Sequence, residues 1–221
     1  MPDKKHIALI LGASGLIGKE TLILLLNNNK YTRIYAVSRK PLGIHHSKLT
    51  EVIADSSNIE DAIKDIQVDH FFSCIGTTKA KTPELNQYYA IDLDYPLKVA
   101  KLLHANGCDT MCLVSSIGAN TSASNSYLQL KGKVEEAMKT VGFNSLHIFR
   151  PSLLLGKREE YRFLEHVGQI IYPIIGKLFF GKLKDYKGIQ GKTVASAMIN
   201  VASSIITGTY IYPTQLIKEL A

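Results

Sequence analysis

Short apolar runs alternate with longer amphipathic stretches along the first 150 residues of the chain. The apolar runs predict strands at residues 6–11, 33–38, 49–54, 68–74, 111–114 and 145–149. The stretches between them predict helices at residues 16–26, 58–66, 86–105 and 127–140, and a further helix is predicted at 192–204. Strand and helix in regular alternation are typical of an α/β fold with a parallel sheet. We therefore expect a doubly wound parallel sheet in one domain spanning residues 1–221, with a small C-terminal lid at residues 151–190.

The first predicted strand and helix are joined by a glycine turn with the spacing G-x-x-G-x-x-G. Gly12 permits a tight turn off the strand, Gly15 lets the backbone approach a pyrophosphate, and Gly18 lets the helix pack closely on the sheet. The free N–H groups at the start of the helix then face the phosphate anions. Because a strand precedes the turn and another follows about 20 residues later, the pattern predicts a Rossmann-type dinucleotide site.

Another kind of phosphate-binding loop is excluded at the same place. Gly18-Lys19 resembles the end of the nucleoside triphosphatase loop G-x-x-x-x-G-K-[ST]. That loop needs glycine at position 13 and serine or threonine at position 20, where this chain has Ala13 and Glu20. A carboxylate cannot replace the hydroxyl that binds magnesium, so the sequence argues against a nucleoside triphosphatase.

The end of the second predicted strand bears on the choice of cofactor. An Asp or Glu there would bind the ribose 2′-hydroxyl of NAD, but this chain has Ser38-Arg39-Lys40. Arginine pairs with a 2′-phosphate through forked, charge-assisted hydrogen bonds, so Arg39, with added charge from Lys40, predicts NADP. The alternative is a pair of solvated cations. After the third strand, Asp55 is expected either to accept a hydrogen bond from the adenine amino group or to cap the next helix.

The loop after the fourth predicted strand is expected to line the same cleft. It reads Cys74-Ile75-Gly76-Thr77, and Gly76 again permits close approach of the backbone. Ligands of a doubly wound sheet bind at the carboxyl ends of the strands, where the strand order reverses. Ile75, Gly76 and Thr77 are therefore candidate cofactor contacts.

A tyrosine and a lysine four residues apart carry the candidate chemistry. Tyr127 and Lys131 lie one turn apart on the same face of a predicted helix. A tyrosine can exchange a proton with the substrate oxygen during hydride transfer, and a nearby ammonium lowers the pKa of a tyrosine from its usual value of about 10. Ser115 and Ser116 end the fifth strand, where a hydroxyl can hold the carbonyl oxygen, and we favour Ser116. A core tyrosine beside a surface lysine is the alternative.

The motifs together resemble the atypical short-chain dehydrogenases/reductases and, within them, the Tat-interacting oxidoreductase subfamily. The matching segments are residues 12–15, 74–81, 92–95, 113–119, 127–132 and 149–155. The resemblance implies an NADPH-binding fold in which Tyr127 is the acid/base and Lys131 binds the nicotinamide ribose. Asp92 departs from the wider superfamily, which often has asparagine there, and this puts a full proton relay in doubt.

The resemblance also implies further contacts and limits. The implied cofactor contacts are Ser14, Gly15, Leu16 and Ile17 at the pyrophosphate, Arg39 at the 2′-phosphate, and Arg150 and Pro151 beside the nicotinamide and substrate. Relatives that process nucleotide sugars usually have a larger substrate lobe than the lid expected here. A homodimer through the helices at residues 86–105 and 127–140 is compatible with the resemblance.

Composition and charge bear on possible partners, metal binding and location. The net charge is +7, but the basic residues are scattered and form no recognised motif, so no nucleic-acid partner is expected. The three cysteines and seven histidines show no metal-binding spacing, and no metal is expected. No apolar run reaches the length of a membrane span and the first residues show no signal-peptide pattern, so we expect a cytoplasmic protein without an integral membrane segment.

These observations predict an NADP-dependent oxidoreductase that transfers hydride between NADPH and a small carbonyl or alcohol substrate. An apolar or aromatic carbonyl compound suits the aromatic residues expected in the lid, which are Tyr161, Phe163, Tyr172, Phe179 and Phe180. Two alternatives stay open, because fold alone does not decide function. One is an NADPH-binding regulator or scaffold with little turnover. The other is an NAD-dependent epimerase or dehydratase, against which Arg39 and the small lid argue.

Overall fold

Seven parallel strands form one central sheet in the computed structural model, which describes residues 4–76, 84–155, 188–204 and 206–221. The strands are β1 (His6–Leu11), β2 (Tyr31–Ser38), β3 (Leu49–Ile53), β4 (His70–Ser73), β5 (Thr110–Val114), β6 (Ser145–Arg150) and β9 (Gly208–Pro213). Their order across the sheet is β3-β2-β1-β4-β5-β6-β9. The strand order reverses between β1 and β4, so the expected doubly wound sheet is confirmed. A separate pair, β7 (Leu154–Leu155) and β8 (Ile189–Gln190), is also parallel.

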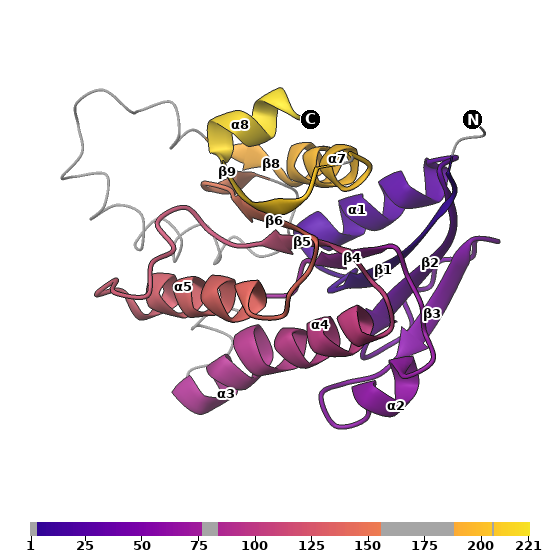
Figure 1. Cartoon of the computed structure of the whole chain (residues 1–221), viewed down its shortest axis with the longest axis horizontal. Coiled ribbons are helices and arrows are strands. Elements are labelled where there is room, and N and C mark those ends of the chain that lie inside the picture. The colour runs from indigo at the N-terminus through magenta and orange to yellow at the C-terminus, as the bar shows by residue number, and fades with distance from the viewer. Residues whose placement is uncertain (1–3, 77–83, 156–187, 205) are drawn as a thin grey trace.

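Helices cover both faces of the sheet (Figure 1). One face carries α1 (Leu16–Asn27), α7 (Gly191–Ala202) and α8 (Thr214–Glu219). The other carries α2 (Ile59–Ile63), α3 (Leu85–Tyr89), the π-helical segment η1 (Ala90–Asp94), α4 (Tyr95–Ala105) and α5 (Ser126–Lys139). Each face has its own apolar core, built around residues such as Leu22 and Met198 on the first face and Val99 and Leu130 on the second. Burial of the sheet on both faces explains why its strands read as apolar runs.

The predicted helix at residues 86–105 is interrupted in its middle. Between α3 and α4, the segment η1 takes π-helical turns, and the N–H of Tyr95 bonds to the carbonyl of Ala90, five residues back. Pro96 follows directly, and a proline has no N–H to donate to the carbonyl of Asp92 four residues before it. Single π-turns inside helices are frequent at functional sites. Here the turn carries Asp92, whose side chain is buried.

Two elements near the C-terminus, β9 and α8, are absent from the sequence prediction. Strand β9 lies at the edge of the sheet beside β6, and Tyr212 is its one buried residue. An edge strand that buries so little leaves no clear apolar run to detect. The strand nevertheless matters for the core, because Tyr212 stacks on Phe149 with ring centroids 4.9 Å apart.

Several predicted features lie outside the described residues. These are Thr77, most of the lid and all five of its aromatic residues, Tyr161, Phe163, Tyr172, Phe179 and Phe180. In the part of the chain that the structure describes, no helix is long and apolar enough to cross a membrane.

Candidate active site

The glycine turn between β1 and α1 is held by close backbone contacts. Gly12 has a φ of +90°, and a β-carbon at this position would lie 2.8 Å from the carbonyl carbon of Cys74. The N–H of Gly15 donates to the carbonyl of Gly12 at 3.0 Å. Gly15 is the N-cap of α1 and has no side chain to satisfy the first N–H groups of the helix. This end of α1 therefore has the backbone chemistry of an anion site.

Around the turn, the predicted phosphate contacts differ in exposure. Ser14 is exposed, Leu16 is half-buried, and Ile17 and Gly18 are buried. A β-carbon at Gly18 would lie 2.1 Å from the carbonyl oxygen of Gly12, so helix α1 packs against the turn as closely as the sequence pattern predicts.

Charged residues gather where β2 and β3 end. Arg39 and Lys40 are both exposed, and the Ser38 hydroxyl donates to the carbonyl of Lys40 at 2.7 Å. Asp55 accepts hydrogen bonds from the N–H and hydroxyl of Ser57, which, with the nearby charge of Arg39, hold the pKa of its carboxyl below the usual value. Asp55 also caps the turn that leads into α2: its N–H donates to Asn58 Oδ1 at 2.9 Å while its carboxylate accepts from Ser57, so the structure supports the capping alternative, with Asn58 as the last residue before the helix.

Helix α5 presents the predicted tyrosine and lysine on one face. Its N-cap Asn125 accepts from the N–H groups of Tyr127 and Leu128 at 3.0 and 3.2 Å, which fixes the first turn. The Lys131 ammonium lies 5.9 Å from the centroid of the Tyr127 ring. A β-carbon at Gly132 would lie 2.4 Å from the backbone of Asn120, so only glycine lets the loop after β5 pack on this helix.

A buried ion pair joins Lys131 to the π-turn. The Lys131 ammonium lies 2.9 Å from the Asp92 carboxylate, and the two side chains are 7% and 0% exposed. Burial works to lower the pKa of Lys131, but the charge of Asp92 and the hydrogen bond to it, together with the nearby Tyr127 and Glu135, outweigh burial, and the pKa is raised. A β-carbon at Gly76 would lie 3.3 Å from the same ammonium nitrogen. The end of β4, the π-turn and helix α5 therefore meet at one point, and Asp92 is a site residue whose role the sequence did not predict.

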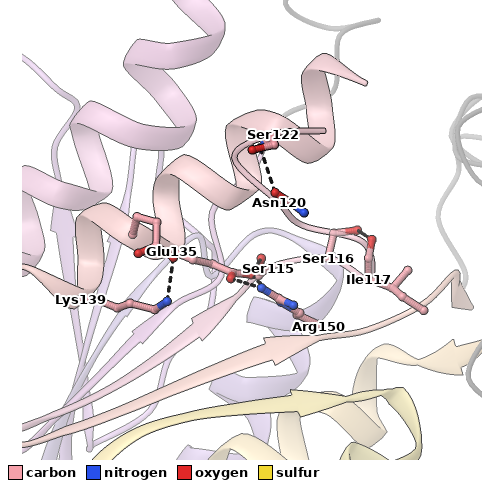
Figure 2. A network of polar contacts seen from close by, with 9 residues as sticks. Ser115, Ser116, Ile117, Asn120, Ser122, Glu135, Lys139 and Arg150 are labelled. Carbon is pink, nitrogen blue, oxygen red and sulfur yellow. Dashed lines mark hydrogen bonds and ion pairs between the residues drawn. The ribbon is translucent and has the colours of Figure 1, made fainter. Parts of the chain in front are cut away.

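The two candidate serines have different partners (Figure 2). The buried Ser115 hydroxyl donates to the Glu135 carboxylate, which is 1% exposed. Half-buried Ser116 makes a longer bond of 3.3 Å to the carbonyl of Ile117. Because Ser115 is engaged in a buried network, Ser116 stays the predicted serine of the site.

Arg150 belongs to the same buried network. Its guanidinium forms two hydrogen bonds to the Glu135 carboxylate, one of them 2.9 Å long from Nε (Figure 2). Glu135 thus ties α5 to the ends of β5 and β6, and nothing in the sequence analysis pointed to it. Its spacing was the available signal, because it lies four residues beyond Lys131 on the same helix face. The carbonyl of buried Pro151 accepts from the N–H of Ile117 at 3.0 Å. Contacts of Arg150 and Pro151 with a nicotinamide stay predictions.

Comparison with a family model and with curated proteins places the chain among known sequences. The model of the NAD dependent epimerase/dehydratase family matches residues 8–139. Protein HTATIP2 of Rattus norvegicus is 34% identical over 199 residues, covering 86% of this chain and 78% of the relative. The mitochondrial protein FMP52 of Candida glabrata is 33% identical over 201 residues, covering 90% of this chain and 85% of the relative.

Solved structures share the fold at low sequence identity. The WbmH enzyme of Bordetella bronchiseptica, solved in complex with NAD+, superposes with a TM-score of 0.71 at 19% identity, covering 97% of this chain and 79% of that one. A UDP-N-acetylglucosamine 4-epimerase of Methanobrevibacter ruminantium gives 0.68 at 18% identity, covering 95% and 77%. A short chain dehydrogenase family protein of Francisella tularensis gives 0.69 at 16% identity, covering 96% and 98%.

The relatives overturn one expectation from the sequence. FMP52 proteins from several fungi, at 29–33% identity, are named as mitochondrial, so the expected cytoplasmic localisation is wrong. Among the described residues, no three His, Cys, Asp or Glu side chains lie together as a metal site.

Three observations indicate the same family: the family model, the match to HTATIP2 and the seven-stranded Rossmann-like sheet. The chain belongs to the NAD dependent epimerase/dehydratase family of short-chain dehydrogenase/reductase type, as a homologue of HTATIP2.

Proposed function

We propose that this protein is an NADPH-dependent oxidoreductase that reduces a small carbonyl compound. The observation that carries the proposal is the meeting of Lys131, Asp92 and Gly76 at the end of β4, with Tyr127 one helical turn from Lys131. The same loop packs against Gly12 of the phosphate turn. The expected cofactor site and the acid/base pair are thus continuous along one edge of the sheet.

The donor set at this edge fits a phosphorylated dinucleotide. The uncapped start of α1, from Leu16 to Gly18, offers backbone N–H groups to the pyrophosphate. The exposed cations Arg39 and Lys40 would hold the 2′-phosphate, which the ribose of NAD lacks. In this account Ile75 and Gly76 border the nicotinamide, and Lys131 holds its ribose. Among the known structures of this fold, WbmH was solved with NAD+.

The residues of this chain would then handle the substrate oxygen. The bound nicotinamide supplies the hydride that reduces the carbonyl carbon. The Ser116 hydroxyl donates a hydrogen bond to the carbonyl oxygen and orients it. The Tyr127 hydroxyl gives its proton to this oxygen as negative charge develops there. Lys131, fixed by Asp92, keeps the tyrosine helix and the ribose site in register.

The experiment is a comparison of wild type, Tyr127→Phe and Tyr210→Phe with NADPH and a broad panel of carbonyl compounds. Tyr127→Phe is expected to lose about 100-fold or more in turnover and to keep its affinity for NADPH, because only the proton donor is removed. Tyr210→Phe, which removes a hydroxyl from edge strand β9, is the matched control and should retain turnover. An NADPH-binding regulator or scaffold would instead show no NADPH oxidation with any compound of the panel.

A second candidate is an epimerase or dehydratase that keeps NAD bound through its cycle. The family model and the fold shared with a UDP-N-acetylglucosamine 4-epimerase favour it. Purified protein that carries NAD and exchanges it slowly would support this reading. Protein that binds added NADPH reversibly would support the reductase.

The names of the FMP52 relatives also support a mitochondrial location for this protein. Fractionation of cells, with detection of the untagged chain in each fraction, tests this part of the proposal. Recovery away from mitochondria would contradict it.

A further inference from the structure

We propose that two copies of this chain associate through strand β9, pairing antiparallel so that their sheets become one continuous sheet. Strand β9 is the last strand of the sheet, and among the described strands it pairs with β6 alone. Association through this edge is independent of the proposed cofactor and substrate, because it lies in the backbone and side chains of β9 itself.

The backbone of β9 presents unpaired groups to one side. The N–H of Gly208 donates to the carbonyl of Asn144 at 2.7 Å, so Gly208 bonds toward β6. In a parallel ladder every second residue of a strand bonds to the same neighbour. Thr209 and Ile211 fall on the alternate positions, so their N–H and carbonyl groups point away from β6. These groups are placed to bond to a further strand.

Exposed apolar side chains gather at the same edge. Tyr210 and Ile211 are 38% and 39% exposed, and Ile206, just before the strand, is 40% exposed. The other large apolar residues with this exposure lie singly on α1, β3 and β7. In the described part of the chain, α3, η1, α4 and α5 carry none. The edge at β9 therefore has more apolar surface to bury than the helices through which the resemblance allowed a homodimer.

The usual protections of an open edge are missing from β9. Proteins commonly guard such edges with charged residues or with a proline inside the strand. Strand β9 has no charged residue, and its proline, Pro213, is the last residue of the strand. The opposite edge, β3, has Glu51 in its middle, and this carboxylate accepts from the N–H of Leu42 in a neighbouring loop. Two copies of β9 can meet without opposing like charges, whereas two copies of β3 cannot.

A two-fold axis at Tyr210 makes the strand complementary to itself. Antiparallel pairing about this axis sets Thr209 opposite Ile211 of the partner subunit, and each such pair can exchange both of its N–H···O bonds. An axis at Ile211 would instead set Thr209 opposite a proline, which has no N–H to donate. The Tyr210 ring stacks on His147 with centroids 5.9 Å apart and is still partly exposed, so it can meet the partner's Tyr210 across the axis.

The size of the edge and the charge of the chain set the expected strength. The six residues of β9 span about 20 Å, which is short for a standard-size interface, so we expect a monomer–dimer equilibrium. The net charge of +7 opposes the approach of two copies. Added salt screens this repulsion, and dimerisation should therefore strengthen as salt rises.

The test is sedimentation of the full-length protein over a range of concentrations at low and high salt. Ile211→Lys places a cation at the axis and should weaken dimerisation at least about tenfold. Ile53→Lys makes the same change at the end of the other edge strand, β3, and should leave dimerisation unchanged. A protein that stays monomeric up to about 1 mM would overturn the inference. A dimer that Ile211→Lys leaves intact, or that salt dissociates, would also overturn it.

A cross-link tests the register directly. Tyr210→Cys puts a thiol on the axis, so mild oxidation should give a covalent dimer that a reducing agent separates. Ile53→Cys, oxidised in parallel with wild type, should give no more covalent dimer than wild type, whose described cysteines are buried or half-buried. A Tyr210→Cys protein that cross-links no more than wild type would overturn the pairing about Tyr210.

Hydrogen exchange covers the case in which the variants do not fold, because it uses the wild-type protein. The amides of Thr209 and Ile211 should exchange quickly in dilute solution and slowly in concentrated solution, as pairing protects them. Exchange rates that do not change with concentration would overturn the inference. Slow exchange at every concentration would mean that another part of the same chain covers the edge.

Discussion

Gly18 faces the carbonyl oxygen of Gly12 so closely that a β-carbon at position 18 would lie 2.1 Å from that oxygen. The contact joins the residue directly after β1 to the first turn of α1, and backbone atoms on both sides leave no flexible group to move. Gly18→Ala should therefore push α1 away from the turn and destabilise the protein by about 3 kcal/mol.

Urea unfolding and NADPH titration together measure this effect. Lys19→Ala, at the neighbouring exposed position of the same helix, is the control and should change stability by less than about 0.5 kcal/mol. If Gly18→Ala were as stable as the wild-type protein, α1 could not pack against the turn as closely as this distance indicates.

Glu135 is expected to stabilise the fold strongly, because it joins α5 to the ends of β5 and β6. Glu135→Gln removes the charge that Arg150 and Ser115 bind. We expect a loss of about 2–3 kcal/mol, less than for a fully buried pair because the Arg150 side chain is 29% exposed. Chemical denaturation measures it, with Glu136→Gln as control, since exposed Glu136 pairs with Lys139 at the surface. Equal losses in the two variants would contradict this role.

A histidine at the amino-terminal end of central strand β4, away from the candidate active site, should make stability depend on pH. His70 shares a 2.7 Å hydrogen bond with the Tyr31 hydroxyl, and burial, followed by the charge of His6, lowers its pKa to about 3. An unfolded histidine titrates near 6.5, so between these values the unfolded chain binds more protons than the folded one. The free energy of unfolding should fall as pH falls through this window, by up to about 1.4 kcal/mol per pH unit for this one group.

His70→Asn, which keeps an amide for Tyr31, should make this fall shallower. Denaturation from pH 7 to pH 4 measures the slope. His45→Asn, at an exposed position, should leave the slope as in wild type. A His70→Asn slope that matches wild type would show that other groups carry the acid sensitivity.

Much of the site was readable from the sequence because its signals are local. Residues of β4 are all buried, so the strand reads as an apolar run, and the glycine spacing reflects contacts that any side chain would block. Tyr127 and Lys131 share a face through helical periodicity alone. The partner of Lys131 was not readable, because it depends on the hydrogen-bond register of the π-turn that precedes Pro96. Likewise, which of Ser115 and Ser116 points toward Glu135 depends on how the end of β5 lies against α5.

Arg39 should carry the preference for NADPH over NADH. Arg39→Ala should lose about tenfold in affinity for NADPH and little for NADH, since only NADPH has the 2′-phosphate. Arg33→Ala removes an exposed arginine of β2, the strand that Arg39 directly follows, and is the matched control. A similar loss for both cofactors in Arg39→Ala would indicate general destabilisation instead of phosphate recognition.

The most direct test of the account is calorimetric titration of the cofactor-free wild-type protein with NADPH and, separately, with NADH. We expect NADPH to bind at least tenfold more tightly, a difference of about 1.4 kcal/mol. Equal affinities would remove Arg39 from its proposed role and favour the NAD-dependent alternative. Absence of binding by both would contradict the central claim, and the Gly12–Gly18 turn would then be a structural feature alone.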